Sequence, residues 1–431
     1  MEQHTVLNVL RQHTFLTIGC TDPVAIGLAV AHACQGSEGK IRKVRVCLDR
    51  NIYKDTVSVG IPGTRSSGVD LAVALAIIKG RPEAGLELFK DIEPGDIEQA
   101  KAFLKDHEVR LELDEEATGI RITATIVTEK GVYEALIEGA HDRLLEKRVN
   151  GHSTFRAETA CDEATLSGRN SLQYLRDISI SEIFDTIEAM EPLELLFLLQ
   201  GVEQNLKAAQ AGLVEDTGLE LGRALQSLLD GQLLPDSIIN RIRILTAAAA
   251  DARMGGVKVP IFGCFGSGNH GITFFITVGE MGHHLGKNDE EIAKALALGL
   301  LVVGVIKTRT GILTPHCGCA VAAGTGASAA VTYMLGGTAR QIESAVQLMT
   351  ANLTGMLCDG AKYGCALKIA TSAGVAIETA YLAHAGVTIP DGNGIIGDSF
   401  QETMDNLEIV TDRGMKNVDQ AVLDVLLKGQ N

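Results

Sequence analysis

The chain has 431 residues, 46% of them hydrophobic, which is enough for two or three domains with a large core. Its formal net charge of −16 disfavours nucleic acid and anionic membranes as partners. The N-terminal stretch is polar and the longest apolar run covers only about a dozen residues, so we expect neither a secretory signal nor a membrane span, and we predict a cytoplasmic protein.

Helical and strand patterns alternate in the N-terminal third. Residues 1–35 look helical, and we expect this segment to pack on the C-terminal domain. Residues 44–48 alternate as in a half-buried strand, and Val57 and Val59 extend that alternation. Residues 120–126 and 132–137 predict a β-hairpin with Gly131 at a positive φ. Helices are expected over 66–79 and 96–106.

Helical patterns fill the rest of the chain. Ser179 and Glu182 have the spacing of a capping box. Helical spacing recurs over 181–213, 218–230, 236–253, 289–306, 319–334, 338–353, 365–384 and 415–428. The sequence therefore predicts an α+β fold, with an α/β domain over 36–155 and an all-helical catalytic domain over 178–431. The boundary is expected near 150–178.

Two glycine-containing motifs precede the cysteine-rich region. GSGNHG, at Gly266–Gly271, matches the dinucleotide pattern, but no βαβ unit or suitably placed acid surrounds it. A Gly-rich backbone that leads into a helix can still bind an anion such as a substrate carboxylate, or it can be a plain turn. Just upstream, DARMGG offers either substrate contacts or a helix end with a glycine cap, and the spacing favours the helix end.

Four of the nine cysteines lie in two short motifs, HCGC at 316–319 and CDGAKYGC at 358–365. Their spacing is neither that of a zinc ribbon nor that of a ferredoxin. Three thiolates on three loops would suit an iron–sulfur cluster, and buried structural cysteines are the alternative. Cys20 lies just ahead of a helix that begins near Pro23, where the helix dipole favours a thiolate, although a lone cysteine there is more often inert.

Six stretches together resemble the L-cysteine desulfidases, which are related to the α chain of bacterial iron–sulfur L-serine dehydratases. They are GCTDPVA, IPGT, DARMGG, GSGNHGIT, HCGCAVAA and MLCDGAKYGCALK, spread from residue 19 to about residue 370. The resemblance implies a [4Fe–4S] cluster held by three cysteines with one iron left open. By motif, Cys358 and Cys365 carry over, and Cys317 is the predicted third ligand, with Cys319 as the alternative.

The resemblance also implies a reaction, in which L-cysteine and water give pyruvate, ammonia and hydrogen sulfide. Cys20 corresponds to a cysteine that acts as a base or as a movable ligand, and we predict it as the catalytic base. The substrate carboxylate is expected on Ser267, Gly268, Asn269 and His270. L-serine, or another β-substituted amino acid, is the alternative substrate. A non-catalytic metal or iron–sulfur sensor and a nucleotide-dependent oxidoreductase are alternatives of other classes. We expect a small amino acid as the ligand and a homodimer or higher homo-oligomer.

Overall fold

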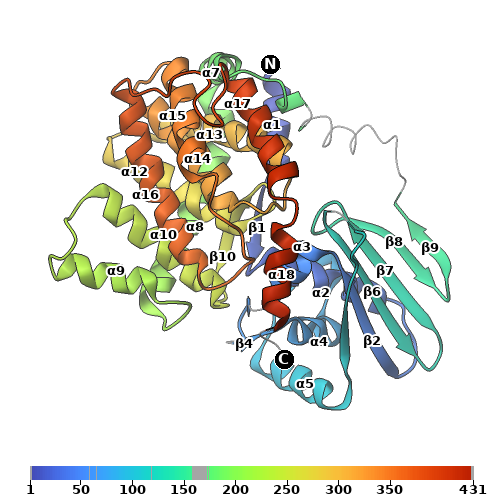
Figure 1. Cartoon of the computed structure of the whole chain (residues 1–431). Helices are drawn as coiled ribbons and strands as arrows, with labels where there is room; N and C mark the ends of the chain where they lie inside the picture. The colour runs from blue at the N-terminus through green and yellow to red at the C-terminus, as the bar shows by residue number, and fades with distance from the viewer. Residues whose placement is uncertain are drawn as a thin grey trace.

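The computed structural model describes residues 2–428 except 58, 65, 118, 158–171 and 173. It has two parts side by side, a mixed sheet with its helices and a larger bundle of helices (Figure 1). The predicted α+β fold, with helices dominating the C-terminal part, is confirmed. The predicted boundary near 150–178 falls largely outside the described residues. Strand β9 ends at Arg156, and α7 begins at Ile180.

The N-terminal part is built on one six-stranded sheet with the order β5-β2-β6-β7-β8-β9. β2 pairs in parallel with β5, and the other neighbouring strands are antiparallel. Helix α2 packs on β6 and β7, and α4 packs on α2. The strands are β2 (Ile41–Leu48), β5 (Val109–Leu113), β6 (Arg121–Thr128), β7 (Val132–Glu138), β8 (Leu144–Val149) and β9 (His152–Arg156). The helices are α2 (Thr21–Cys34), α3 (Arg50–Thr56), α4 (Val69–Lys79), η1 (Pro82–Glu87) and α5 (Pro94–Asp106), and β3 (Gly60–Ile61) pairs with β4 (Ser66–Ser67).

The predicted hairpin is confirmed as β6 and β7, whose register ends with Val127 opposite Val132. The prediction of a positive φ at Gly131 is wrong, because Gly131 is not among the glycines in the left-handed region. The turn is closed instead by Thr128, whose Oγ1 accepts hydrogen bonds from the N–H groups of Lys130 and Gly131. Glycine is needed for space, since a Cβ at Gly131 would lie 2.9 Å from Oδ1 of Asn150.

The strand-like alternation at Val57 and Val59 is also misleading. The chain leaves β2 at Leu48 and enters α3, which ends at Thr56. Asp49 starts this helix, because its Oδ1 accepts hydrogen bonds from the N–H groups of Asn51 and Ile52. The N-cap formed by Asp49 thus starts a helix directly after β2, where the alternation of apolar residues had suggested that the strand continues.

The N-terminal segment divides between the two parts, which corrects the expectation that residues 1–35 pack together on the C-terminal domain. α1 (Gln3–Gln12) buries its apolar stripe in the core of the helical part, and β1 (Thr14–Ile18) pairs with β10 (Pro260–Cys264). α2 lies in the core of the sheet instead. α2 is apolar on nearly all sides, and a helix of that kind needs cover all round. The strand β10 also departs from the expectation of an all-helical C-terminal domain.

The helical part is centred on α13, whose residues from Ala295 to Ile306 are fully buried. α13 packs against α14, and α10 packs against α8 and α16. The Ser179–Glu182 capping box is confirmed at the start of α7. The elements are η2 (Pro192–Leu198), α7 (Ile180–Ala189), α8 (Leu199–Val214), α9 (Leu221–Asp230), α10 (Ile238–Met254), α11 (Gly268–Gly271), η3 (Ile272–Ile276), α12 (Thr277–His284), α13 (Asp289–Thr310), η4 (Cys319–Gly324), α14 (Thr325–Met334), α15 (Ala339–Leu353), α16 (Cys365–His384), α17 (Phe400–Ile409), η5 (Val410–Gly414) and α18 (Val418–Lys428).

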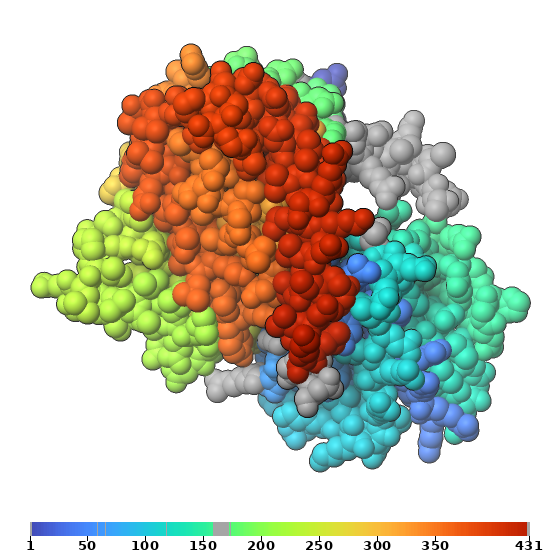
Figure 2. All heavy atoms as spheres, viewed as in Figure 1, coloured from blue at the N-terminus to red at the C-terminus, as the bar shows by residue number. Residues whose placement is uncertain are grey.

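The C-terminal helix α18 joins the two parts. It lies across their junction in Figure 1, and the C-terminal residues cover that face in Figure 2. α18 packs against α3, and Oδ1 of Asp419 accepts a 2.7 Å hydrogen bond from Nζ of the buried Lys54. In the described part of the chain, every helix is too short or too polar to cross a bilayer.

The link between α1 and β1 generates a testable prediction. The ring of His13 stacks on Phe265 with 4.9 Å between ring centroids, and burial lowers the pKa of His13 to about 4. The unfolded chain therefore binds a proton near pH 6.5 that the folded chain takes up only near pH 4, so stability falls as pH drops through this window. We expect the free energy of unfolding to fall by about 2 kcal/mol between pH 7 and pH 5 on account of this residue.

His13→Phe should remove that part of the pH dependence, because phenylalanine keeps the stacked ring and has no buried polar nitrogen such as Nε2 of His13. Chemical denaturation at both pH values measures the effect. His152→Phe, at an exposed position on β9, is the control and should leave the pH dependence as in the wild type. Equal acid sensitivity of the wild type and His13→Phe would contradict the assignment.

Candidate functional site

One cavity between the two parts collects nearly all of the residues that the sequence singled out. It encloses about 80 Å³. Gly268 is the only predicted site residue that does not line it, and its backbone lies against the side chain of Arg253. The predicted residues that line the cavity are Cys20, Ser267, Asn269, His270, Cys317, Cys358 and Cys365, and the alternative ligand Cys319 lines it too.

A short antiparallel bridge places two of the thiols. His316 and Leu357 are paired across this bridge. The N–H of Cys317 donates to the carbonyl of Met356 at 2.7 Å, and the N–H of Cys358 donates to the carbonyl of Pro315 at 2.8 Å. Cysteines 41 positions apart in sequence are thereby held side by side at the cavity wall.

The third thiol stands at the first residue of α16. The N–H of Lys362 donates to Sγ of Cys365 at 3.4 Å, and this thiol donates to the carbonyl of Gly360 at 3.5 Å. Gly360 has φ +94°, and a Cβ there would lie 2.5 Å from the carbonyl oxygen of Lys54. The glycine in CDGAKYGC thus allows the loop to turn back tightly against α3, so that Cys365 faces the same cavity as Cys358.

Cys317 and Cys319 differ in their protonation. The thiol of Cys319 donates a hydrogen bond to Cys317 and, with backbone N–H groups, lowers the pKa of Cys317 to about 7, while burial acts in the opposite direction. The same hydrogen bond, together with burial, raises the pKa of Cys319 well above its usual range. The negative charge of Cys317 also contributes to the raised pKa values of Cys358 and Cys365. Cys317 is therefore the member of the pair that is readily ionised and electrostatically linked to both other thiols.

The cavity carries a surplus of positive charge in an otherwise acidic protein. Four cations line it, against the two carboxylates of Asp22 and Asp55. Burial raises the pKa of Asp55 to about 7, which weakens the negative side further. Burial also lowers the pKa of Lys307 to about 8, so this amine is still mostly charged at neutral pH. The cations are Lys54, Arg253, Lys307 and Lys368. Lys54 pairs with Asp419 and Lys368 pairs with Asp359, and neither carboxylate lines the cavity. Among the described residues Arg253 and Lys307 have no such ion pair, and these two cations suit an anionic occupant.

Cys20 precedes α2 as predicted, but its ionisation is opposite to the prediction. Its Sγ donates to Oδ2 of Asp22 at 3.2 Å, and Oδ1 of Asp22 lies 3.0 Å from Nε2 of His141. Burial and the charge of Asp22 raise the pKa of Cys20 well above its usual range, although Arg253 acts in the opposite direction. The expected thiolate is therefore corrected to a thiol, because the buried carboxylate outweighs the helix dipole.

The GSGNHG segment connects β10 to a continuous helical stretch over 268–284, with Ser267 at its start. β10 pairs only with β1, in antiparallel fashion, so the described residues form no dinucleotide-binding βαβ unit here. Burial and the nearby charge of Lys307 lower the pKa of His270 well below its usual value, so the ring is neutral. The N–H groups at the start of a helix can bind an anion, and a neutral imidazole beside them does not repel it.

The DARMGG segment is both a helix end and a cavity wall. α10 ends at Met254 and is capped by Gly255, as the spacing predicted. Asp251 points away from the cavity and accepts hydrogen bonds from the N–H groups of Leu219 and Gly222, near the start of α9. Arg253 lines the cavity, and its Nη1 donates to Oδ1 of Asn269 at 2.8 Å.

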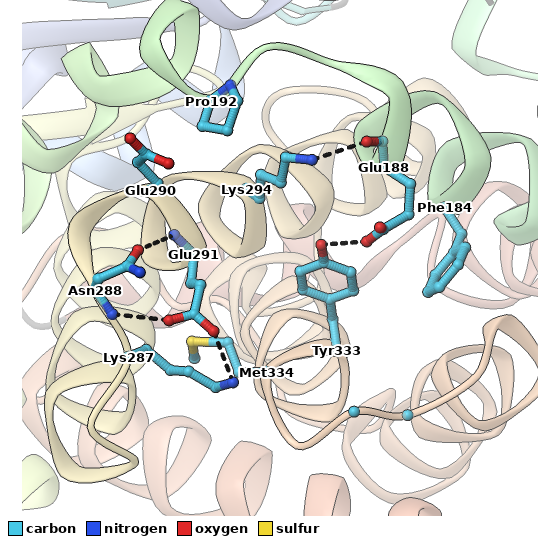
Figure 3. A pocket seen from close by; sticks show the side chains of 12 residues that line it. Phe184, Glu188, Pro192, Lys287, Asn288, Glu290, Glu291, Lys294, Tyr333 and Met334 are labelled. Carbon is cyan, nitrogen blue, oxygen red and sulfur yellow. Dashed lines mark hydrogen bonds and ion pairs between the residues drawn. The ribbon is translucent and has the colours of Figure 1, made fainter.

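A second, open pocket of about 480 Å³ lies between α7, α13 and α14 (Figure 3). Several of its polar side chains are paired with one another. Tyr333 donates to Glu188 at 2.5 Å, and Lys287 pairs with Glu291 at 2.9 Å. No thiol is among its described lining residues. This pocket thus has neither the soft thiol ligands nor the surplus of positive charge of the thiol-lined cavity.

Comparisons with known proteins show relatives over nearly the whole chain. Residues 83–424 match the family described as serine dehydratase alpha chain. The chain is 34% identical to a UPF0597 protein of Desulfatibacillum aliphaticivorans over 99% of this chain and 98% of that protein. It is 35% identical to UPF0597 proteins of Desulfotalea psychrophila and Caldanaerobacter subterraneus, in each case over 98% of both chains.

The chain belongs to the serine dehydratase alpha chain family. Membership implies a lyase with an iron–sulfur amino acid dehydratase-like role. The recognition made from the six sequence stretches is thereby confirmed at the level of the family.

The chemistry of the lining fits the cofactor of this family. Among the described residues, no three His, Cys, Asp or Glu side chains are placed to hold a single metal ion. An iron–sulfur cluster needs a different arrangement of ligands. Each thiolate binds a different iron, so the ligand sulfur atoms lie farther apart than the ligands of a single metal ion. Soft thiolates select such clusters. The cationic wall suits the negative charge that thiolate ligands bring.

The sequence analysis missed several residues that line the cavity, and also His141, which contacts a lining residue. Lys307 follows directly on an apolar helical stretch, and a lysine buried at such a place is rare enough to have been a signal. Asp55 and Lys54 lie on α3, which the strand-like alternation concealed. His141 comes from the β7–β8 loop and reaches Asp22 only through the tertiary fold, so the sequence held no signal for it.

The fully buried His316 provides a test of how the thiols are positioned. Its Nδ1 lies 2.7 Å from the carbonyl oxygen of Thr354, and its Nε2 lies 2.8 Å from Oγ1 of Thr411. His316→Ala should lower the free energy of unfolding by about 2–4 kcal/mol, because it leaves buried partners unsatisfied and opens a cavity. In mildly denaturing solution, Cys317 should also react faster with a thiol reagent.

Denaturant melts and mass-spectrometric mapping of labelled cysteines measure these two effects. His384→Ala, at the exposed end of α16, is the matched control and should change neither. Wild-type stability together with wild-type labelling of Cys317 in His316→Ala would show that the bridge does not depend on this ring.

Proposed function

We propose that the protein is an iron–sulfur-dependent β-elimination lyase that converts L-cysteine and water into pyruvate, ammonia and hydrogen sulfide. The observation that carries the proposal is the convergence of three cysteines from separate segments on one buried, cationic cavity. The preference for L-cysteine rests on the resemblance to the desulfidases. L-serine is the second candidate, and the family name favours it.

Cys317, Cys358 and Cys365 would hold a [4Fe–4S] cluster. When bound, the cluster supplies a Lewis acid for the β-leaving group of the substrate. The low pKa of Cys317 supports its choice over Cys319, since the ligand must be a thiolate. Cys319 would then remain as the hydrogen-bond donor to the ligand sulfur, a role that adjusts the basicity of a ligand.

The chain's own residues would position the amino acid. The loop at Ser267–His270 offers a helix start to the substrate carboxylate, and neutral His270 adds a polar edge without repelling the anion. The burial of the cavity excludes water, which strengthens each of these polar contacts.

Cys20 remains the proposed catalytic residue, and its protonation sets a condition on this role. Its thiol hydrogen points to Asp22, whose pKa is lowered by hydrogen bonds from His141 and Cys20, in opposition to burial. The thiol must therefore give up its proton before sulfur can accept the α-proton of the substrate. The Asp22 carboxylate, which His141 holds in place, accepts the hydrogen bond of this thiol, but with its lowered pKa it is too weak a base to keep the proton. The charge of Arg253 lowers the pKa of Cys20 and would favour the thiolate.

The ligand assignment can be tested by anaerobic reconstitution with iron and sulfide. We expect the wild type to bind iron and sulfide in equal amounts and to form pyruvate from L-cysteine. Cys358→Ala and Cys317→Ala should lose most of the bound iron, whereas Cys319→Ala should retain it. Cys47→Ala, on strand β2, is the matched control and should behave as the wild type.

Iron and acid-labile sulfide analysis, together with the visible spectrum, measures the outcome. Full iron content in Cys317→Ala, with loss in Cys319→Ala, would exchange the two roles. Full iron content in both, or in Cys358→Ala, would refute the proposed ligand set. A loaded protein that forms pyruvate from neither L-cysteine nor L-serine would favour a sensor or binding protein.

The catalytic role of Cys20 can be tested separately from cluster binding. Cys20→Ala should keep a normal iron content and lose pyruvate formation by about 10²–10⁴-fold, the usual contribution of general acid–base catalysis. Rates from steady-state kinetics, normalised to bound iron, measure this loss. A rate per cluster within a few-fold of the wild type would remove Cys20 from the mechanism.

A further inference from the structure

Arg253 is a buried cation whose hydrogen bonding is incomplete. Its side chain is 2% exposed. Nε donates to the carbonyl of Gly19 at 3.1 Å, and Nη1 donates to Oδ1 of Asn269 at 2.8 Å. Nη2 is buried and has no hydrogen-bond partner among the described residues. Both acceptors are neutral, so the guanidinium has no directly bonded counter-anion in this part of the chain.

Such an arrangement is costly without a ligand. A buried donor without a hydrogen-bond partner destabilises the fold, and a charged donor does so more strongly. The neutral acceptors fix the orientation of the guanidinium but do not neutralise it. Because Arg253 lines the cavity, the missing partner is an anion that enters from the cavity.

The surroundings of Arg253 indicate a small carboxylate as that anion. The guanidinium lies against Gly268, where a Cβ would stand 2.5 Å from Nε and 3.0 Å from Nη2. Gly268 begins the helical stretch after Ser267, so the free donor and the helix start face the same place. A second cation, Lys307, lies near: a Cβ on Gly318 would stand 3.1 Å from its Nζ and 2.2 Å from Nε2 of His270.

We infer that Arg253 binds the α-carboxylate of the substrate through Nη2, with Lys307 adding a second positive charge. This inference rests on the proposed function and deepens it, because it restricts the substrate class to amino acids with a free α-carboxylate. Arginine suits the role because its planar fork can hold two protein acceptors and still present a donor to a carboxylate. The amine product of decarboxylation, or an amide or ester of the substrate, lacks the charge that Arg253 requires.

The test uses equilibrium binding, so that it does not depend on turnover. L-alanine has an α-carboxylate but no β-leaving group, and ethylamine is the same molecule without the carboxylate. Calorimetry on the anaerobically reconstituted full chain should show binding of L-alanine and none of ethylamine. Arg253→Gln should weaken L-alanine binding about 10- to 100-fold, the usual value of a charged hydrogen bond.

Two further variants keep the test decisive. Arg241→Gln makes the same change on the same helix at an exposed ion pair with Asp236, and it should bind L-alanine as the wild type does. Arg253→Lys keeps the charge and loses the fork, so it should bind about tenfold more weakly and raise KM for the reactive substrate more than it lowers kcat. If Arg253→Gln does not fold, the affinity of Arg253→Lys for L-alanine tests whether Arg253 binds the carboxylate.

Wild-type affinity for L-alanine in folded Arg253→Gln or in Arg253→Lys would overturn the inference. So would the absence of L-alanine binding in the wild type, or equal binding of ethylamine. Failure of the proposed function has a different signature. In that case L-alanine binding would depend on Arg253, while neither L-cysteine nor L-serine would yield pyruvate.

Discussion

The pairing of backbone segments 315–317 and 356–358 is the constraint on which the rest of the site depends. Two hydrogen bonds set Cys317 beside Cys358, and the buried ring of His316 anchors the bridge to Thr354 and Thr411. Holding residues 41 positions apart in one place costs loop-closure entropy, which is offset by the packing of α14 and α15 between them. Once the bridge is in place, the tight turn at Gly360 brings Cys365 to the same cavity. A site of three thiols is therefore a consequence of one strand-like contact inside a helical bundle.

The positive charge of the cavity wall indicates what kind of ligand the cavity binds. The chain is strongly acidic, yet its cavity wall carries more cations than carboxylates. Burying cations is unfavourable unless an anion compensates them, and Asp419 and Asp359 compensate only Lys54 and Lys368 among the four. An anionic occupant would compensate Arg253 and Lys307. Thiolate ligands and a substrate carboxylate together would supply the negative charge. Irregular helix geometry accompanies this wall. The π-helical turn η3 follows the helical turn that holds Asn269 and His270, and the π-helical turn η4 begins at Cys319. Such turns are frequent at functional sites, because they shift side chains out of regular register.

The sequence predicted the helices, the strands and the site motifs better than it predicted the tertiary contacts between them. Helices with a strong local signal, such as α7 with its capping box, and the β6–β7 hairpin follow from nearby residues alone. The motifs identified many of the residues that line the cavity, because each motif is short and continuous. Predictions from neighbouring residues failed where a residue distant in the sequence determines the protonation or the position of a side chain. The pKa of Cys20 depends on burial and on the nearby carboxylate of Asp22, and the place of α2 depends on the core that covers all of its sides. Arg253 matters because its buried Nη2 has no hydrogen-bond partner among the described residues. No pattern in the sequence encodes these contacts.

The central claim is that three thiols hold one cluster with a single iron open to the amino acid. Mössbauer spectroscopy of the protein reconstituted with isotopically labelled iron tests it most directly, with and without L-cysteine or L-serine. The account predicts that one of the four iron signals differs from the other three and that only this signal shifts when substrate is added. Four irons with complete protein ligation and no response to either amino acid would contradict it.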